Sequence, residues 1–225
     1  MTNPYEIISL EIQGYENRRV KNKFFWQEQI TKTLAVILPG WGYTCDMPLL
    51  YYTTRLFLGY GVDVLQLRAD YATPDFHSAS REQRAGMLYS DAQALFTAGQ
   101  NQREYMQVIV VGKSLGTITM SSLVIQNQLP PMTITIWLTP LLNTPRIVEA
   151  LGRLASPSLV IGGSVDQAYD QDILAQIQEL PGITALTIEG ANHSLEIPGD
   201  LSRSIRLMDE ILGSIIGFID PFIKE

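Results

Sequence analysis

The sequence is poor in the residues that bind metals and form disulfides. Its 225 residues include a single cysteine, Cys45, and two histidines, His77 and His193. One cysteine excludes both an intrachain disulfide and a cysteine metal cluster, and so few histidines argue against a structural zinc site. We therefore expect a protein that works without a metal or a cofactor.

Basic charge and long apolar runs are lacking as well. The formal net charge is −7, whereas nucleic acids and anionic membranes attract basic surfaces. No apolar run approaches the ~20 residues that span a bilayer. The N-terminal stretch MTNPYEIISLEIQ also lacks the basic and then apolar layout of a signal peptide. These absences predict a cytoplasmic protein without nucleic-acid or membrane partners, and they leave its oligomeric state open.

What the sequence does contain is a series of short apolar runs separated by stretches with helical periodicity. An alternating N-terminal pair, EIISLEIQ and RVKNKFFWQE, is followed by TLAVILPG, VDVLQLRAD, QVIVVGKS, ITIWLTP, SLVIGGSVD and ITALTIEGANH. Continuous apolar runs are typical of strands that are covered on both faces. We predict one α/β domain over residues 1–225, with a mostly parallel central sheet, helices on both faces and an N-terminal antiparallel hairpin at the edge.

The stretch QVIVVGKSLGT, residues 107–117, admits two interpretations. A phosphate-binding loop needs a glycine five residues before Gly112, but that position is Gln107, and the residues between them are stiff and β-branched. The alternative is a nucleophile elbow, in which Gly112 and Gly116 flank a serine between a strand and a helix. The pattern favours the elbow, with Ser114 as its nucleophile.

A serine nucleophile needs a base and an acid, and in sheets of this kind all three follow the carboxyl ends of strands. His193 is the only histidine after Ser114, and it follows the last predicted strand. Asp166 follows the strand before that one and is the first choice of acid, because Asp170 and Asp172 are better placed to begin the next helix. The structural alternatives are a simple loop histidine and a helix-capping Asp166.

Other residues at the strand ends suggest the surroundings of the serine. The apolar residues Tyr43, Leu141 and Leu142 are expected at an acyl pocket, although such residues are as often part of a core. His77 is interpreted first as a surface residue and second as a substrate contact. The role of Lys113, directly beside the serine, stays open.

Taken in order, the segments LPGWG, GKSLG, GGSVD and GANHS resemble the α/β-hydrolase superfamily over nearly the whole chain. The chain is most similar to small members without a cap, near the dienelactone-hydrolase-like and short acyl-esterase branches. The resemblance implies Ser114 as nucleophile, Asp166 as orienting acid and His193 as base. It also implies an oxyanion hole formed by the backbone N–H groups of Trp41 and Leu115. One departure is Pro-Gly in the first loop, where many relatives have His-Gly.

The predicted function is a serine hydrolase that forms an acyl-enzyme and cleaves an acyl bond, foremost that of a small carboxylic ester. Only about 20 residues separate the sixth strand from the seventh, too few for a lid of the lipase kind. An open site of this kind predicts a small-molecule acyl substrate. A thioesterase or peptidase with the same triad, and a binding protein on an inert hydrolase fold, are the alternatives.

Overall fold

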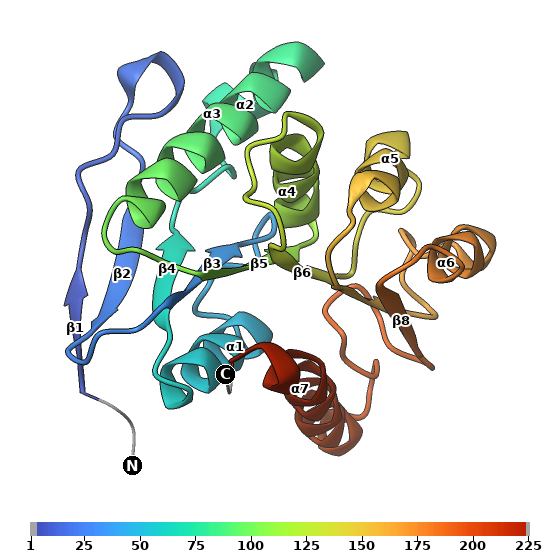
Figure 1. Ribbon diagram of the computed structural model, residues 1–225. Helices are drawn as coiled ribbons and strands as arrows, with labels where there is room; N and C mark the ends of the chain where they lie inside the picture. Colours follow the sequence, from blue (N-terminus) through green and yellow to red (C-terminus); the bar gives the residue numbers. More distant parts are fainter. Residues whose placement is uncertain (1–3, 224–225) are drawn as a thin grey trace.

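The computed structural model describes residues 4–223 and contains one eight-stranded sheet (Figure 1). The strand order is β1-β2-β4-β3-β5-β6-β7-β8. The strands β3 to β8 are parallel to one another, whereas β1 and β2 pair with antiparallel register at the edge. This confirms the predicted mostly parallel sheet and its antiparallel N-terminal pair. The strand bounds are β1 Tyr5–Ile8, β2 Asn22–Gln27, β3 Thr33–Leu38, β4 Asp63–Leu67, β5 Gln107–Lys113, β6 Ile134–Leu138, β7 Ser158–Gly163 and β8 Ile183–Ile188.

Helices cover both faces of the sheet, as predicted (Figure 1). One face carries α1 (Pro48–Gly59) and α7 (Leu201–Ile223). The other carries α3 (Arg81–Gln100), α4 (Leu115–Ile125), α5 (Pro145–Arg153) and α6 (Gln171–Gln178). Two short elements, η1 (Tyr15–Asn17) and α2 (Pro74–Ser78), lie in the connections.

The central strands are apolar on both sides because a separate hydrophobic core packs against each face of the sheet. In β5, Val108 and Val110 pack into the core under α3, α4 and α5, whereas Ile109 and Val111 pack into the core under α1 and α7. Side chains alternate between the two faces of a strand, so a strand with a core on each side must be apolar at every position. This explains the uninterrupted apolar runs in the sequence.

The first strand is shorter than its alternating pattern predicts. The pattern extends to Gln13, but β1 ends at Ile8. The side chain of Asn22 accepts a hydrogen bond from the Leu10 amide (2.8 Å) and donates one to the Leu10 carbonyl (2.8 Å). An asparagine side chain thus takes the place of a partner strand, which the alternation of apolar residues does not reveal.

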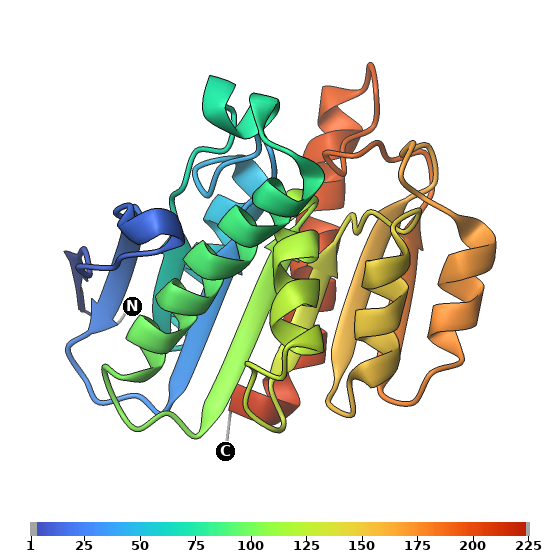
Figure 2. The ribbon, with the colours of Figure 1, turned by 90° about the horizontal axis from the view of Figure 1, so that it is seen from above.

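The connections leave the carboxyl edge of the sheet free of a large lid. A single helix, α5, connects β6 to β7, and the loops that follow the parallel strands gather along one edge (Figure 2). Within residues 4–223, no helix is both long and apolar enough to cross a membrane. In open parallel sheets, ligands bind at this carboxyl edge, so the site is sought there.

Candidate active site

Ser114 occupies a strained turn between β5 and α4. Its backbone angles, φ 51° and ψ −114°, are rare for a residue with a side chain. The two flanking glycines make this turn possible. A Cβ on Gly116 would lie 2.1 Å from the Leu38 carbonyl oxygen, and a Cβ on Gly112 would lie 2.9 Å from the Gly116 carbonyl oxygen. The glycines of the motif are therefore required by close backbone packing.

The structure brings Ser114, His193 and Asp166 into one hydrogen-bonded chain. His193 Nε2 lies 2.7 Å from Ser114 Oγ, and His193 Nδ1 lies 2.7 Å from Asp166 Oδ2. An ionised carboxylate only accepts hydrogen bonds, so Nδ1 carries the proton and Nε2 is free to accept from the serine hydroxyl. The arrangement can draw a proton from Ser114.

Asp166 is held in its ionised form. Its side chain is 3% exposed. Burial alone would raise the pKa of Asp166, but hydrogen bonds from His193 and from the Ala168 amide, together with the charges of His193 and Lys113, lower it overall. Asp166 does not cap the next helix, because the side chain of Asp170 accepts the hydrogen bond from the Ile173 amide at the start of α6. The helix-capping interpretation of Asp166 is therefore wrong.

The loops that carry the acid and the histidine are fastened to each other. A Cβ on Gly163 would lie 2.2 Å from the Ala191 carbonyl oxygen, and the Val165 amide donates to that same oxygen (3.1 Å). Asn192 Oδ1 accepts from the amides of Ser194 (2.9 Å) and Glu196 (3.1 Å). The sequence analysis did not identify Asn192 as a residue that stabilises the histidine loop. An asparagine in a loop is the usual signal of a turn in which its side chain accepts from nearby amides.

The glycine-rich loop after β3 lies against the nucleophile elbow. The Gly40 amide donates to the Tyr43 carbonyl (3.0 Å), and a Cβ on Gly40 would lie 3.2 Å from Ser114 Cβ. Trp41 follows Gly40 directly, and Leu115 is the first residue of α4, where amides have no partner inside the helix. The backbone of both predicted oxyanion donors therefore lies next to Ser114.

The residues expected at an acyl pocket do not all lie at the site. An open hollow of about 430 Å³ beside His193 is lined by Leu141, Val165, Gln167 and Ala168, among others. Leu142 instead packs into the core beneath α5, and Tyr43 is buried with its hydroxyl accepting from the Leu49 amide (3.2 Å). Both residues lie in the core, as the alternative interpretation allowed.

His77 is exposed on α2 and lies at the rim of the site. Its ring contacts the ring of Trp41 edge-on, with centroids 4.8 Å apart. Phe76 also contacts the Trp41 ring edge-on, with centroids 5.8 Å apart. His77 is thus a surface residue, as first interpreted, and it supports the loop that carries Trp41.

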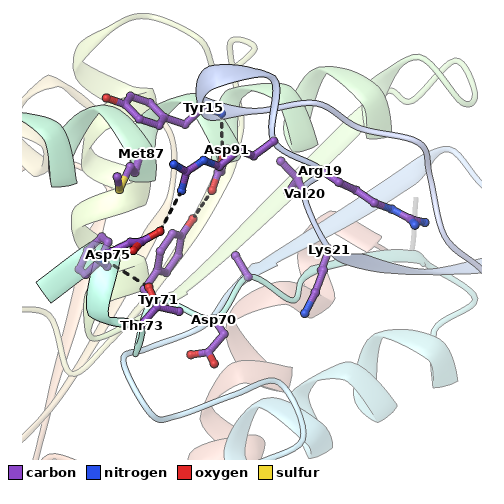
Figure 3. Close-up of a pocket in the computed structure, with 13 residues that line it drawn as sticks. Tyr15, Arg19, Val20, Lys21, Asp70, Tyr71, Thr73, Asp75, Met87 and Asp91 are labelled. Carbon is purple, nitrogen blue, oxygen red and sulfur yellow. Dashed lines mark hydrogen bonds and ion pairs between the residues drawn. The ribbon is translucent and has the colours of Figure 1, made fainter. Parts of the chain in front are cut away.

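A second hollow, of about 310 Å³, is lined by Tyr71, Phe76 and Asp91, among others (Figure 3). The Asp91 carboxylate accepts hydrogen bonds from the Tyr71 hydroxyl (3.0 Å) and the Tyr15 amide (3.0 Å), and the figure shows both groups pointing toward it. Arg18 pairs with Asp75 at 3.6 Å in the same hollow. These contacts connect the segment around η1 to α2 and α3, because Arg18 pairs with Asp75 on α2 and the Tyr15 amide donates to Asp91 on α3. In the described part of the chain, no three His, Cys, Asp or Glu side chains gather as a metal-binding set.

The strand order, the lidless carboxyl edge and the serine elbow together define the α/β-hydrolase fold. No family model and no curated protein matches the sequence. Solved structures share the fold at low identity. A protein of unknown function from Agrobacterium tumefaciens has a TM-score of 0.72 and 21% identity, covering 98% of each chain. A Pyrococcus furiosus esterase has a TM-score of 0.70 and 14% identity, covering 97% of this chain and 93% of its own.

A third similar structure matches the predicted absence of a lid. It is a serine hydrolase without lid from Xanthomonas campestris, with a TM-score of 0.68 and 15% identity, covering 99% of this chain and 97% of its own. The predicted α/β-hydrolase fold without a large lid is thereby confirmed.

Proposed function

We propose that this chain is a serine hydrolase that cleaves small carboxylic esters through an acyl-enzyme. The observation that carries the proposal is the unbroken chain of hydrogen bonds from Ser114 through His193 to Asp166, with both bonds 2.7 Å long. The three residues come from loops after β5, β8 and β7, so the sheet itself holds them in place. A nucleophile, a base and an orienting acid in hydrogen-bond contact are the requirements for acyl transfer.

In the first half-reaction, Ser114 Oγ forms a bond to the ester carbonyl carbon while His193 Nε2 takes the hydroxyl proton. The carbonyl oxygen becomes an oxyanion, which the backbone N–H groups of Trp41 and Leu115 stabilise. When the intermediate collapses, the bond to the alkoxide breaks and His193 gives the leaving oxygen its proton. The products are the free alcohol and an acyl-serine.

In the second half-reaction, water replaces the alcohol. His193 takes a proton from water, whose oxygen attacks the acyl carbon, and the bond to Ser114 Oγ breaks as His193 returns the proton. Asp166 keeps its charge throughout and stabilises the imidazolium that forms twice in the cycle. The released acid completes the turnover without a cofactor.

Two observations support a small ester as substrate. The hollow beside His193 is open, and no lid covers it in the described chain, so it offers no enclosed channel for a long acyl chain. Structures that share the fold include the Pyrococcus furiosus esterase. Because thioesters and amides react through the same triad, the bond type must be measured by comparing acetyl and butyryl aryl esters with the matched thioesters and anilides.

The proposal is tested by labelling with a fluorophosphonate probe, which reacts only with an activated serine. Wild type should be labelled, and Ser114→Ala and His193→Ala should not. Ser202→Ala, which alters an exposed serine on α7, is the matched control and should be labelled like wild type. If folded wild type is not labelled, Ser114 is not an activated nucleophile, and the alternative of a non-catalytic binding protein on this fold is favoured.

A further inference from the structure

Lys113 is a fully buried charged residue at the centre of the site. Its relative exposure is 0%, although it directly precedes the nucleophile and ends β5. A buried ammonium is costly unless it is well hydrogen-bonded. The reaction described above does not use this charge, so its presence beside the triad requires an explanation.

The Lys113 ammonium connects the histidine loop to the end of β6. Nζ donates to the His193 carbonyl oxygen (2.6 Å) and to Thr139 Oγ1 (2.5 Å). It also lies 4.8 Å from the centre of the Tyr43 ring, in the loop after β3. A single side chain thus touches the histidine loop, the end of β6 and the glycine-rich loop. Charge-assisted hydrogen bonds of this kind are stronger than neutral ones.

Thr139 is held in a strained conformation at one end of this connection. Its φ is 42°, which is an outlier for a β-branched residue. The Thr139 amide donates to the Ile161 carbonyl (2.7 Å), which fixes the strained residue in the sheet. Strain of this kind persists where surrounding contacts impose it, and here it places a hydroxyl against the Lys113 ammonium.

We propose that Lys113 is a positioning residue, whose protonated ammonium clamps the His193 backbone to the end of β6 and so keeps the imidazole within reach of Ser114. The inference rests on the proposed hydrolase function. It predicts that the reactivity of Ser114 falls when Lys113 loses its proton, because the clamp then loses its charge.

The surroundings of Lys113 bring the loss of its proton into a pH range that can be tested. Burial lowers the pKa of Lys113 to about 8, while the charge of Asp166 opposes the shift. Among the described residues, Tyr43 also places its ring against the ammonium, and His193 touches it through its backbone carbonyl. Burial raises the pKa of Tyr43, with the nearby Glu196 adding to the rise, so Tyr43 stays neutral while Lys113 titrates.

The test is the rate of fluorophosphonate labelling between pH 6 and pH 10. Wild-type labelling should decline above about pH 8. Lys113→Met, which has a similar length and no charge, should react roughly 10- to 100-fold more slowly at pH 7, since small displacements of a catalytic group have effects of that size. Its rate should show no alkaline decline. Lys32→Met removes an exposed lysine and should behave as wild type.

A second pair of variants keeps the test valid if Lys113→Met does not fold. Thr139→Val removes one acceptor of the ammonium with little change of shape, so it should move the alkaline decline to lower pH, whereas Thr139→Ser should retain the wild-type profile. An unlabelled wild type would refute the hydrolase proposal. A labelled wild type without the alkaline decline, an unshifted Thr139→Val profile, or a Lys113→Met variant with wild-type rates would overturn the role of Lys113.

Discussion

Lys113 should make the free energy of unfolding rise between neutral and alkaline pH. Its pKa is lowered by burial from 10.5 to about 8, with Asp166 opposing the shift. Below pH 8 the lysine is protonated in both states, and the folded state carries the cost of the buried charge. Between about pH 8 and pH 10.5 the folded lysine is neutral while the unfolded lysine still binds a proton, so stability increases with pH.

The size of this gain follows from the two pKa values. Proton linkage gives roughly 2.5 kcal/mol between pH 7 and pH 10, since one pKa unit corresponds to about 1.4 kcal/mol. Lys113→Met has no group that titrates here and should lack the gain. Buried tyrosines such as Tyr71, whose pKa is raised by burial, act on wild type and variant alike and cancel in the difference.

The assay is urea unfolding at a series of pH values from 7 to 10, followed by tryptophan fluorescence. The quantity of interest is the wild-type free energy of unfolding minus that of Lys113→Met. We expect this difference to change by roughly 2.5 kcal/mol across the series, whatever constant effect the substitution has. Lys32→Met should show the wild-type slope. A difference that stays constant within about 0.5 kcal/mol while unfolding remains two-state would refute the reasoning.

Four further predictions concern the elbow, α5, the acid and the oxyanion loop. Gly116→Ala should lower the free energy of unfolding by more than about 3 kcal/mol in urea titrations, because its Cβ would lie 2.1 Å from the Leu38 carbonyl. Gly152→Ala in α5 has no atom within 4 Å of its new Cβ and should stabilise the fold by about 0.5–1 kcal/mol. Asp166→Asn should keep the fold but lower kcat for aryl esters by about 10⁴, and a loss below tenfold would contradict its role as the orienting acid. Trp41→Ala keeps its backbone N–H and should change kcat less than about threefold, whereas a loss near the 10²-fold typical of a missing oxyanion donor would place the indole itself in the reaction.

The fold and the proximity of Ser114, Asp166 and His193 could be predicted because they follow from local patterns. Continuous apolar runs indicate strands covered on both faces, and the carboxyl ends of parallel strands meet at one edge. Ser114, Asp166 and His193 each follow such a run, so their proximity could be predicted without knowledge of side-chain packing. The glycines of the elbow were equally predictable, because a tight crossing of strand and helix leaves no space for a Cβ.

Other features depend on contacts between distant residues and could not be predicted. A lysine at a strand end is usually exposed, and nothing near Lys113 in the sequence indicates that it reaches a carbonyl in the loop after β8. The positive φ of Thr139 arises from its place in the sheet, since threonine itself disfavours it. The early end of β1 likewise depends on Asn22, 12 residues from the amide that it binds.

The unfavourable features of this fold are concentrated around Ser114. Ser114 and Thr139 both have strained backbone angles, and Lys113 carries a buried charge between them. At pH 7 that charge costs the folded state roughly 3 kcal/mol relative to a neutral lysine, and an inert protein would be more stable without it. If Lys113 serves the reaction, Lys113→Met must be labelled more slowly than wild type at pH 7, and its free energy of unfolding must lack the wild-type rise with pH. If Lys113→Met is labelled slowly but its free energy of unfolding still rises with pH, a group other than Lys113 causes that rise. The positioning of His193 would then have to be assigned to that group.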